Sequence, residues 1–275
     1  MNYLYLLATL LFVFGIKRLT NVKSCASGNR LSELGMLVAI ATTIAINYHS
    51  INWTTLVAGV IAGGSVGLFL AKRTPTTEMP ELVAALNGFG GISSALVAAA
   101  AVIDPEAGGG RMSSVATVAA ILIGMVTLTG SFVAYGKLSG KSLNHPLKGA
   151  VRHVLHLVLG LGAAGLGVWM ATATGESTPL LALLLLALVA AALGVFLVMP
   201  IGGADMPVVV SLLNSYSGIA AAFAGLVIDN PLLIVVGSMV GASGLILTQI
   251  MCKAMNRSLG NVLLGGMGGE DEVAE

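Results

Sequence analysis

Residues 180–198 read LLALLLLALVAAALGVFLV, an apolar run without a single charged, amide or hydroxyl side chain. A helix needs about 20 mostly apolar residues to cross the hydrocarbon core of a bilayer, and this run supplies that length. A strand of a membrane β-barrel would instead alternate apolar and polar residues, which the run does not do. The stretch therefore predicts a membrane-spanning α-helix.

The composition of the whole chain agrees with a membrane location. Of 275 residues, 56% are hydrophobic and 9% are charged. A soluble domain carries roughly 25% charged residues, so a soluble fold of this size could not cover its surface with polar groups. The composition excludes a soluble enzyme, a nucleic-acid-binding protein and a disordered protein. Two cysteines, Cys25 and Cys252, provide no disulfide framework.

Nine stretches are long and apolar enough to span a membrane, so we predict an all-α integral membrane protein with nine transmembrane helices. Turn-forming and polar residues separate the stretches, for example Asp104-Pro105 and Asp229-Asn230-Pro231. The predicted spans are residues 2–17, 33–50, 54–71, 81–103, 113–136, 152–172, 179–199, 207–228 and 231–252. The first has no basic region before it and no small-residue cleavage site, so we interpret it as a retained helix.

The distribution of basic residues predicts the orientation in the membrane. Nine is odd, so the termini are expected on opposite sides, and loop lysines and arginines accumulate on the cytoplasmic side. Of the 13 basic residues, 12 lie on the side reached after the first span and only Arg111 lies on the other. The twelve are Lys17, Arg18, Lys23, Arg30, Lys72, Arg73, Lys137, Lys141, Lys148, Arg152, Lys253 and Arg257. The N-terminus is therefore predicted outside and the C-terminus in the cytoplasm.

The third and fourth spans resemble the seventh and eighth at an offset of 127 residues. Met79-Pro80 matches Met206-Pro207, each after an acidic residue, and Asn87 matches Asn214 without a gap. Both Met-Pro pairs begin a helix on the predicted cytoplasmic side, where proline suits the first helical turn. A parallel internal repeat is therefore predicted, related by an axis near the membrane normal. Chance similarity between apolar helices is the alternative.

Few polar side chains lie inside the predicted spans, and no Lys, Arg, Asp or Glu lies near the middle of one. Asn87, Ser131 and Asn214 are the candidates for a functional role, because a buried polar group in lipid needs partners. Each can hold a neighbouring helix, or can hold water and pass a chain of hydrogen bonds. Both interpretations stay open for the two repeat-related asparagines.

Two acidic residues stand at predicted cytoplasmic helix starts. Glu81 and Asp205 can each stabilise a helix dipole there, or can dock a soluble partner, which the short loop around Asp205 favours. Among the histidines, only His156 is even shallowly embedded in a span. It can act as a titratable proton carrier or as a structural residue at the interface.

Two rows of glycines recur at a spacing of four residues. Gly59, Gly63 and Gly67 form one row, and Gly237 and Gly241 form the other. This spacing places small residues on one helix face and lets the backbones of two helices approach closely. We interpret both rows first as helix-packing faces.

Four stretches resemble the beta subunit of proton-translocating NAD(P) transhydrogenases. They are TEMPELVA at 77–84, TGSFVAYGK at 129–137, GGADMPVVVSLLNSYSG at 202–218 and IMCKAMNRS at 250–258. The similarity covers essentially the whole chain, and a run as long as 202–218 is highly specific. The family's beta subunit begins with nine membrane helices and an external N-terminus, in agreement with the count of spans.

The resemblance implies a role in a redox-driven proton pump. The complex of this family moves a hydride from NADH to NADP+ while a proton enters the cytoplasm or matrix. Alpha-type subunits carry the NAD(H) domain and further membrane helices, and the beta subunit continues into an NADP(H)-binding domain. The assembly is a dimer of such units. For this chain, the resemblance implies the inner (plasma) membrane of a bacterial cell.

The resemblance also assigns roles to residues. It places the family's intramembrane asparagine on Asn214 and its polar serine on Ser131. The acid of the short cytoplasmic loop falls on Asp205, and the basic residue leading to the NADP(H) domain falls on Arg257. Relatives often carry a histidine where this chain has Asn87. Because an amide has no useful pKa, either a histidine from a partner helix binds the proton or the path runs on water.

The end of the chain departs from the family pattern. Gly265-Gly266-Met267-Gly268-Gly269 and an acidic tail follow the last span, and no G-x-G-x-x-G motif follows a strand. We expect residues 1–260 to form the nine-helix proton-translocating domain and residues 261–275 to lead toward an NADP(H)-binding domain. The chain alone is expected to bind no cofactor or metal and to catalyse no hydride transfer.

The functional hypothesis is a proton-conducting membrane domain. Asn87, Ser131 and Asn214 would line a narrow hydrated path between the fourth, fifth and eighth spans. Asp205, Arg257 and Glu81 would lie at its cytoplasmic mouth. One alternative is a stand-alone secondary transporter, which would need a midplane site with broken helices. The other is a structural membrane anchor for the nucleotide-binding subunits.

Overall fold

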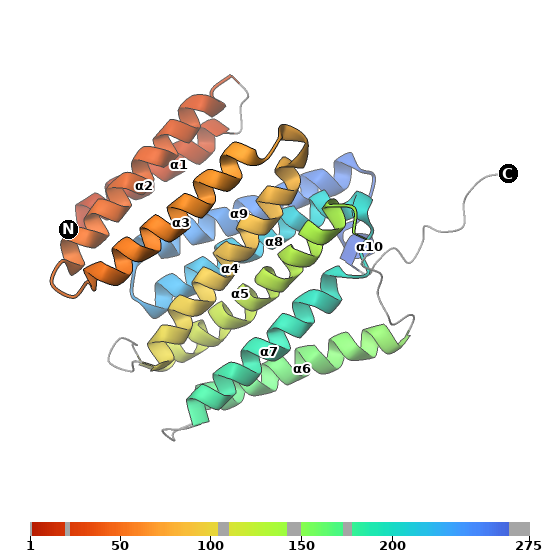
Figure 1. Cartoon of the computed structure of the whole chain (residues 1–275). Helices are drawn as coiled ribbons and strands as arrows, with labels where there is room; N and C mark the ends of the chain where they lie inside the picture. The colour runs from red at the N-terminus through yellow and green to blue at the C-terminus, as the bar shows by residue number, and fades with distance from the viewer. Residues whose placement is uncertain (1, 20–22, 104–109, 142–149, 173–177, 264–275) are drawn as a thin grey trace. The chain divides into compact units, whose positions relative to one another are not determined.

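The computed structural model describes residues 2–19, 23–103, 110–141, 150–172 and 178–263, and its regular structure there is entirely helical (Figure 1). The long helices are α1 (Asn2–Leu19), α2 (Cys25–Asn47), α3 (Trp53–Arg73), α4 (Met79–Ile103), α5 (Gly110–Leu138), α6 (Ala150–Thr172), α7 (Thr178–Val198), α8 (Met206–Val227) and α9 (Pro231–Ala254). The short ones are η1 (Thr76–Glu78), η3 (Gly203–Asp205) and α10 (Leu259–Leu263). Lys148 and residues 264–275 of the expected linker lie outside the described residues.

Helices α2 to α9 are long and apolar enough to cross a membrane, which makes eight candidate spans in the described part of the chain. The predicted class, an all-α protein with several membrane-spanning helices, is confirmed. Helix α1 forms where the first span was predicted but is not among the eight. The count of nine and the side of each terminus stay predictions.

The start of α2 differs from the sequence prediction, because the helix begins at Cys25 and not at residue 33. Its polar first turns pack against the end of α1. A Cβ on Gly28 would lie 2.7 Å from the carbonyl oxygen of Gly15, so the two backbones nearly touch. This close packing stabilises a helix start within a polar stretch. A hydropathy profile measures only how apolar a stretch is, so it does not detect such a start.

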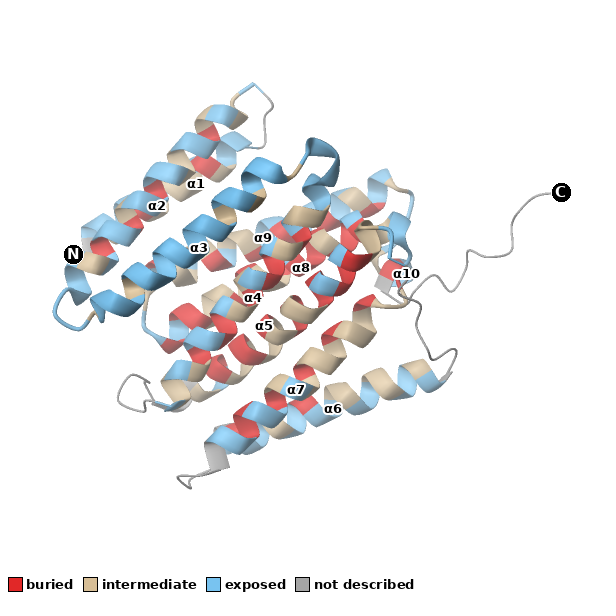
Figure 2. Ribbon diagram, viewed as in Figure 1, coloured by how far each residue is buried: buried red, intermediate tan, exposed pale blue. Residues whose placement is uncertain are grey.

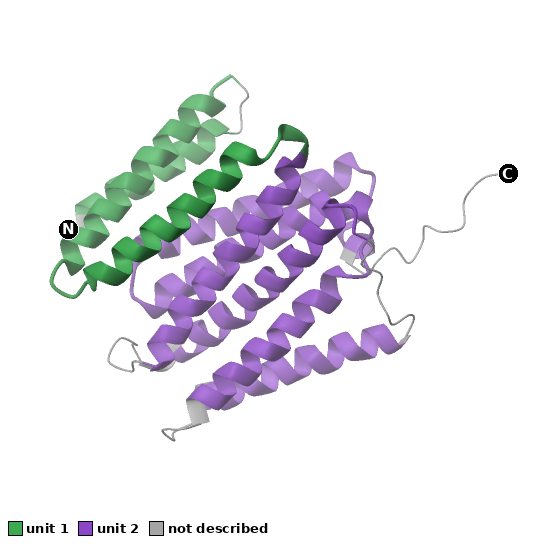
Figure 3. Cartoon of the chain, viewed as in Figure 1, with its two compact units in different colours: residues 1–77 green, residues 78–275 purple. Residues whose placement is uncertain are grey.

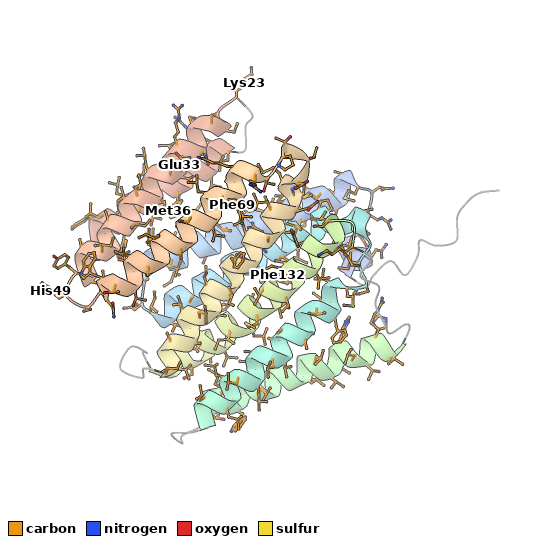
Figure 4. All side chains as sticks on the ribbon, in the orientation of Figure 1. Lys23, Glu33, Met36, His49, Phe69 and Phe132 are labelled. Carbon is orange, nitrogen blue, oxygen red and sulfur yellow. The ribbon has the colours of Figure 1, made fainter. Side chains whose placement is uncertain are left out.

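The chain divides into two compact units, Met1–Thr77 and Glu78–Glu275 (Figure 3). In the first, α1 and α2 pack along each other, and α3 contributes no buried residue. Lys23 and His49 lie at opposite ends of this unit (Figure 4). Near His49, the Tyr48 ring packs edge-on against Trp53 with centroids 5.3 Å apart. Aromatic residues of this kind gather where membrane meets water.

In the second unit, α5 packs against α4, α6, α7 and α8, and α8 packs against α9. Buried residues concentrate on α4, α5 and α8, whereas α6 turns much of its surface outward (Figure 2). Leu157 and Leu161 on α6 are 62% and 65% exposed, and Leu188 on α7 is 67% exposed. An apolar surface of this kind suits contact with lipid.

One end of the second unit carries the candidate cytoplasmic residues, and we call it the mouth end, defined by Lys137, Asp205 and Arg257. Helices α4 and α8 begin there, and α5, α7 and α9 end there. The short helix α10, which the sequence analysis did not foresee, adds the buried Val262 to a core cluster with Val198, Ile201 and Met206. Because α10 spans residue 260, the expected boundary of the membrane domain falls inside a packed helix.

The two Met-Pro pairs share a local structure. Each lies at the start of a long helix, α4 or α8, directly after a short 3-10 helix, η1 or η3. Asp205 is the N-cap residue of α8, and Pro207 occupies its first turn. This likeness agrees with the predicted repeat at one place, and the repeat as a whole stays a prediction.

Glycines bring α8 and α9 into close contact. A Cβ on Gly237 would lie 2.5 Å from the backbone nitrogen of Ala222, and one on Gly218 would lie 2.5 Å from that of Gly241. The Ser215 hydroxyl donates to the Gly241 carbonyl oxygen across the same contact. The predicted packing role of Gly237 and Gly241 is therefore confirmed. A Cβ on Gly59, Gly63 or Gly67 would meet nothing within 4 Å, so that row stays a prediction.

We expect Gly237→Ala to destabilise the protein, because the new methyl group must push α8 and α9 apart. Overpacking of this kind costs about 1–3 kcal/mol. Gly160→Ala on α6 is the matched control, since a Cβ there meets nothing within 4 Å. Its effect should be neutral or mildly stabilising, because alanine favours helix more than glycine does. The unfolding midpoints of the two variants are compared in detergent micelles. Equal midpoints would contradict the predicted loss of stability in Gly237→Ala.

Candidate functional site

A hydrogen bond between two buried side chains joins α4 and α5 about two helical turns in from the mouth end. The Asn87 amide Nδ2 donates to the Ser131 Oγ over 2.9 Å. Asn87 is 9% exposed and Ser131 is 1% exposed. A Cβ on Gly91 would lie 2.7 Å from the Gly124 carbonyl oxygen, so glycines hold the two helices close enough for this bond. The structure therefore brings two of the three predicted path residues together.

The amide oxygen of Asn87 is buried and accepts no hydrogen bond. Leaving a buried acceptor unpaired costs about 1–3 kcal/mol. Two buried hydroxyls further along α4 and α5 are already used, since Thr127 donates to the Ile123 carbonyl and Ser94 to the Gly90 carbonyl of their own helices. The oxygen is therefore available to accept from a bound water or from a polar group of another chain.

An aromatic pair also crosses the seam between α4 and α5. Phe132, labelled in Figure 4, directly follows Ser131 and packs edge-to-face on Phe89, with ring centroids 5.7 Å apart. A Cβ on Gly88 would lie 3.4 Å from the Phe132 ring, so glycine leaves room for this packing. These contacts fix the helix register that aligns Asn87 with Ser131.

Asn214 is placed differently from the other two path residues, because it is exposed on α8. On the α9 side, Thr248 donates to the Ser211 hydroxyl over 3.1 Å. Near Asn214, the half-exposed Ser217 faces α4, and a Cβ on Gly90 would lie 3.2 Å from its hydroxyl oxygen. In the described part of the chain, no hydrogen bond joins Asn214 to the Asn87–Ser131 pair.

Asp205 and Arg257 meet at the mouth end. Arg257 Nε lies 3.8 Å from Asp205 Oδ1, and the side chains are 41% and 14% exposed. Asp205 does not use its carboxylate to cap α8. Arg257 reaches it because Asn256 adopts a φ of 52° just past the end of α9, a left-handed conformation in which asparagine is enriched. The structure thus unites two of the three predicted mouth residues.

Glu81, the third predicted mouth residue, is tied to α5. The Ser139 hydroxyl donates to Glu81 Oε2 over 2.8 Å, so this contact links the start of α4 to the end of α5. His156 near the start of α6 donates from Nε2 to the Phe196 carbonyl oxygen of α7 over 2.9 Å, a contact that supports its structural interpretation. No group of three or more histidine, cysteine or carboxylate side chains in the described part of the chain could hold a metal ion.

Lys137 is a residue of the mouth end whose contacts the sequence analysis missed. Its Nζ donates to the carbonyl oxygens of Met199 and Ile201, each over 2.5 Å. In the sequence it counted as one loop cation among twelve and as the last residue of the family-like stretch 129–137, with no role assigned to it. Carbonyl acceptors have no sequence signature, so only the packing of α5 against α7 reveals them.

Comparison with known proteins now decides the family. The family model of the NAD(P) transhydrogenase beta subunit matches residues 1–275. The chain belongs to the NAD(P) transhydrogenase beta-subunit family. A protein named NAD(P) transhydrogenase subunit beta from Rhodospirillum rubrum is 43% identical over 278 residues, covering 98% of this chain and 59% of the relative. A second Rhodospirillum rubrum protein of that name, from a specified strain, gives the same figures. The chain thus spans about three-fifths of the length of these relatives.

We expect the Asn87–Ser131 bond to appear as a coupling energy in a double-mutant cycle. Asn87→Ala, Ser131→Ala and the double variant should be non-additive in unfolding free energy by roughly 0.6 kcal/mol, the average for hydrogen bonds between membrane helices. Asn87→Ala combined with Ser238→Ala is the control, because the exposed Ser238 bonds only to its own helix. If the unfolding free energies are additive for both pairs, the Asn87–Ser131 hydrogen bond does not stabilise the protein.

Proposed function

We propose that this chain is the proton-conducting membrane domain of an NAD(P) transhydrogenase complex. The proton crosses here while partner domains transfer a hydride from NADH to NADP+. The observation that carries the proposal is the buried Asn87 amide, which is bonded to Ser131 on one side and has an unpaired oxygen on the other. Its place about two turns inside a membrane-spanning helix suits a hydrated path.

Asn87 and Ser131 would conduct through water. Neither side chain titrates near neutral pH, so neither carries the proton itself. The Asn87 oxygen can accept from a water molecule, while the Ser131 hydroxyl accepts from Asn87 and remains able to donate. Together they can hold a short chain of hydrogen bonds across the seam between α4 and α5.

The exposed amide of Asn214 indicates that a partner helix, and not lipid, covers this part of α8. An amide without partners in hydrocarbon costs several kcal/mol, so a helix or water must cover it. Ser217 extends the same face on α8, and the exposed Ser93 lies on neighbouring α4. We infer that a polar helix of an alpha-type subunit covers this face and completes the path, with a histidine as the titratable group that Asn87 does not provide.

Asp205 and Arg257 would dock the NADP(H)-binding domain at the mouth end. Their separation of 3.8 Å exceeds hydrogen-bond length, and Asp205 Oδ1 accepts no hydrogen bond. A partly exposed ion pair contributes about 0–1 kcal/mol, so a docked domain can replace it at small cost. Coupling requires that the nucleotide state favour one arrangement of this pair over another.

The complex is expected in the bacterial inner membrane as a dimer of alpha- and beta-type units. In the anchor alternative, the Asn87–Ser131 bond only holds two helices together. The stand-alone transporter requires interrupted helices near the membrane centre. In the described residues, α4, α5, α8 and α9 run unbroken over 25, 29, 22 and 24 residues, which disfavours it.

Asn87→Leu in the complete complex tests the path, because leucine keeps the number of side-chain heavy atoms and the branch at Cγ and removes both the donor and the acceptor. In proteoliposomes we expect proton-driven hydride transfer to fall at least about tenfold, a change of 1.4 kcal/mol in the barrier. Ser238→Ala is the control for loss of a hydroxyl elsewhere. Unchanged proton flux in an assembled Asn87→Leu complex would support the anchor alternative instead.

Arg257→Gln tests docking at the mouth end. We expect it to weaken binding of a separately produced NADP(H) domain several-fold at low salt, with a smaller difference at high salt because ions screen the charge. The unfolding free energy of the membrane domain should change by less than about 1 kcal/mol. Lys253→Gln removes a nearby exposed cation as the control. If both variants bind the domain equally well, Arg257 does not dock it.

A further inference from the structure

The end of α7 carries backbone carbonyls that the helix itself cannot satisfy. The last carbonyls of any α-helix lack intrahelical donors. Here the Met199 nitrogen donates to the Val195 carbonyl over 3.0 Å, and the Ile201 nitrogen donates to the Val198 carbonyl over 3.1 Å. The carbonyls of Phe196, Met199 and Ile201 instead accept from side chains of other helices.

Two flanking helices supply those donors. His156 of α6 reaches the Phe196 carbonyl, and Lys137 of α5 reaches both the Met199 and the Ile201 carbonyls. The ammonium group therefore bridges two carbonyls of the turn that follows α7. Charged donors make stronger hydrogen bonds than neutral ones, so Lys137 contributes most to holding this turn in place.

The segment that Lys137 holds leads directly to Asp205. Gly202 follows Ile201 in an extended conformation, with φ of −66° and ψ of 153°, and η3 then ends at Asp205. The Asp205 nitrogen closes this turn by donating to the Gly202 carbonyl over 3.1 Å. Ile201 is 1% exposed, which anchors the turn in the core on its other side. The position of Asp205 therefore depends on where Lys137 holds the turn.

The helix that carries Lys137 also carries Ser131. The two residues lie less than two turns apart on α5, and both are within its unbroken helical span. A shift of α5 that changes the Asn87–Ser131 contact therefore moves the donor that holds the Asp205 turn.

We propose that Lys137 is a positioning residue that couples the buried Asn87–Ser131 pair to the Asp205 turn at the mouth end. This inference rests on the proposed function, because it gives Lys137 a part in the communication between the proton path and the docked NADP(H) domain. Lys137 acts through Met199 and Ile201 and not by touching nucleotide or proton.

The first experiment measures the position of the turn without reference to proton flux. A nitroxide label is attached at Ala204→Cys, an exposed position beside Asp205, in the complete complex after Cys25 and Cys252 are replaced by alanine. We expect Lys137→Met to shorten the rotational correlation time of the label. Lys141→Met is the matched control, because Lys141 is an exposed lysine four residues further along the chain, just past the end of α5. An unchanged spectrum in an assembled Lys137→Met complex would overturn the proposal.

The second experiment measures coupling in the same variants. We expect Lys137→Met to lower proton-driven hydride transfer about five- to tenfold, within the usual range of coupling energies, and to lower the number of protons moved per hydride. Lys141→Met should do neither. Lys137→Arg keeps a cation with several donors and should restore part of the coupling. If Lys137→Met does not assemble, Lys137→Arg and Lys137→Gln are compared by the same two readouts.

The outcomes separate this proposal from the proposed function. A mobile label together with normal coupling would show that Lys137 holds the turn but is not part of the pump, which overturns the proposal. Loss of hydride transfer with an unchanged number of protons per hydride, and no rescue by arginine, would indicate a general structural defect and overturns it also. If Asn87→Leu leaves proton flux intact, the proposed function fails, while the label still reports whether Lys137 holds the turn.

Discussion

The requirement that backbone and side-chain polar groups find partners without water governs this structure. Inside a membrane this requirement is met along a helix, where backbone groups pair with one another. It is not met by the helix itself for the carbonyls at its end or for polar side chains on its faces. At the end of α7, Lys137 and His156 satisfy carbonyls that the helix cannot. In α5, the Thr127 hydroxyl donates a hydrogen bond to the Ile123 carbonyl of the same helix. Where the requirement is not met, at the Asn87 oxygen, we place the functional site.

Glycines make those polar contacts possible. Between membrane helices, lipid is as apolar as the side chains, so association depends on close packing. Gly91 and Gly124 bring α4 against α5, and Gly218 and Gly237 bring α8 against α9. Hydroxyls such as that of Ser215 then reach backbone carbonyls of the next helix. Gly194 brings α7 equally close to the backbone of α5, whereas the outer helix α6 has few such approaches and presents leucines outward.

In the proposed function, the described chain holds half of a path. The Asn87–Ser131 pair is complete within the second unit, whereas Asn214 is exposed and needs a cover that this unit does not supply. The mouth end also has polar groups that a partner could contact. Asp205 and Arg257 form a long ion pair that a docked domain can replace. Both features suit a membrane domain that works only with partner chains, and Lys137 lies between them.

Composition and hydropathy were enough to predict an all-helical membrane protein, because lipid requires long apolar helices whatever their arrangement. The spacing of Gly237 and Gly241 also predicted a packing face, since small residues at that spacing allow close approach. Polar residues inside the spans pointed to Asn87, Ser131 and Asn214, and the family resemblance pointed to Ser131, Asn214, Asp205 and Arg257. Only the tertiary structure showed that Asn214 is exposed while Asn87 and Ser131 are buried, and which carbonyls accept from Lys137. Helix rotation and backbone acceptors depend on packing between distant segments, and neither leaves a pattern in the order of residues.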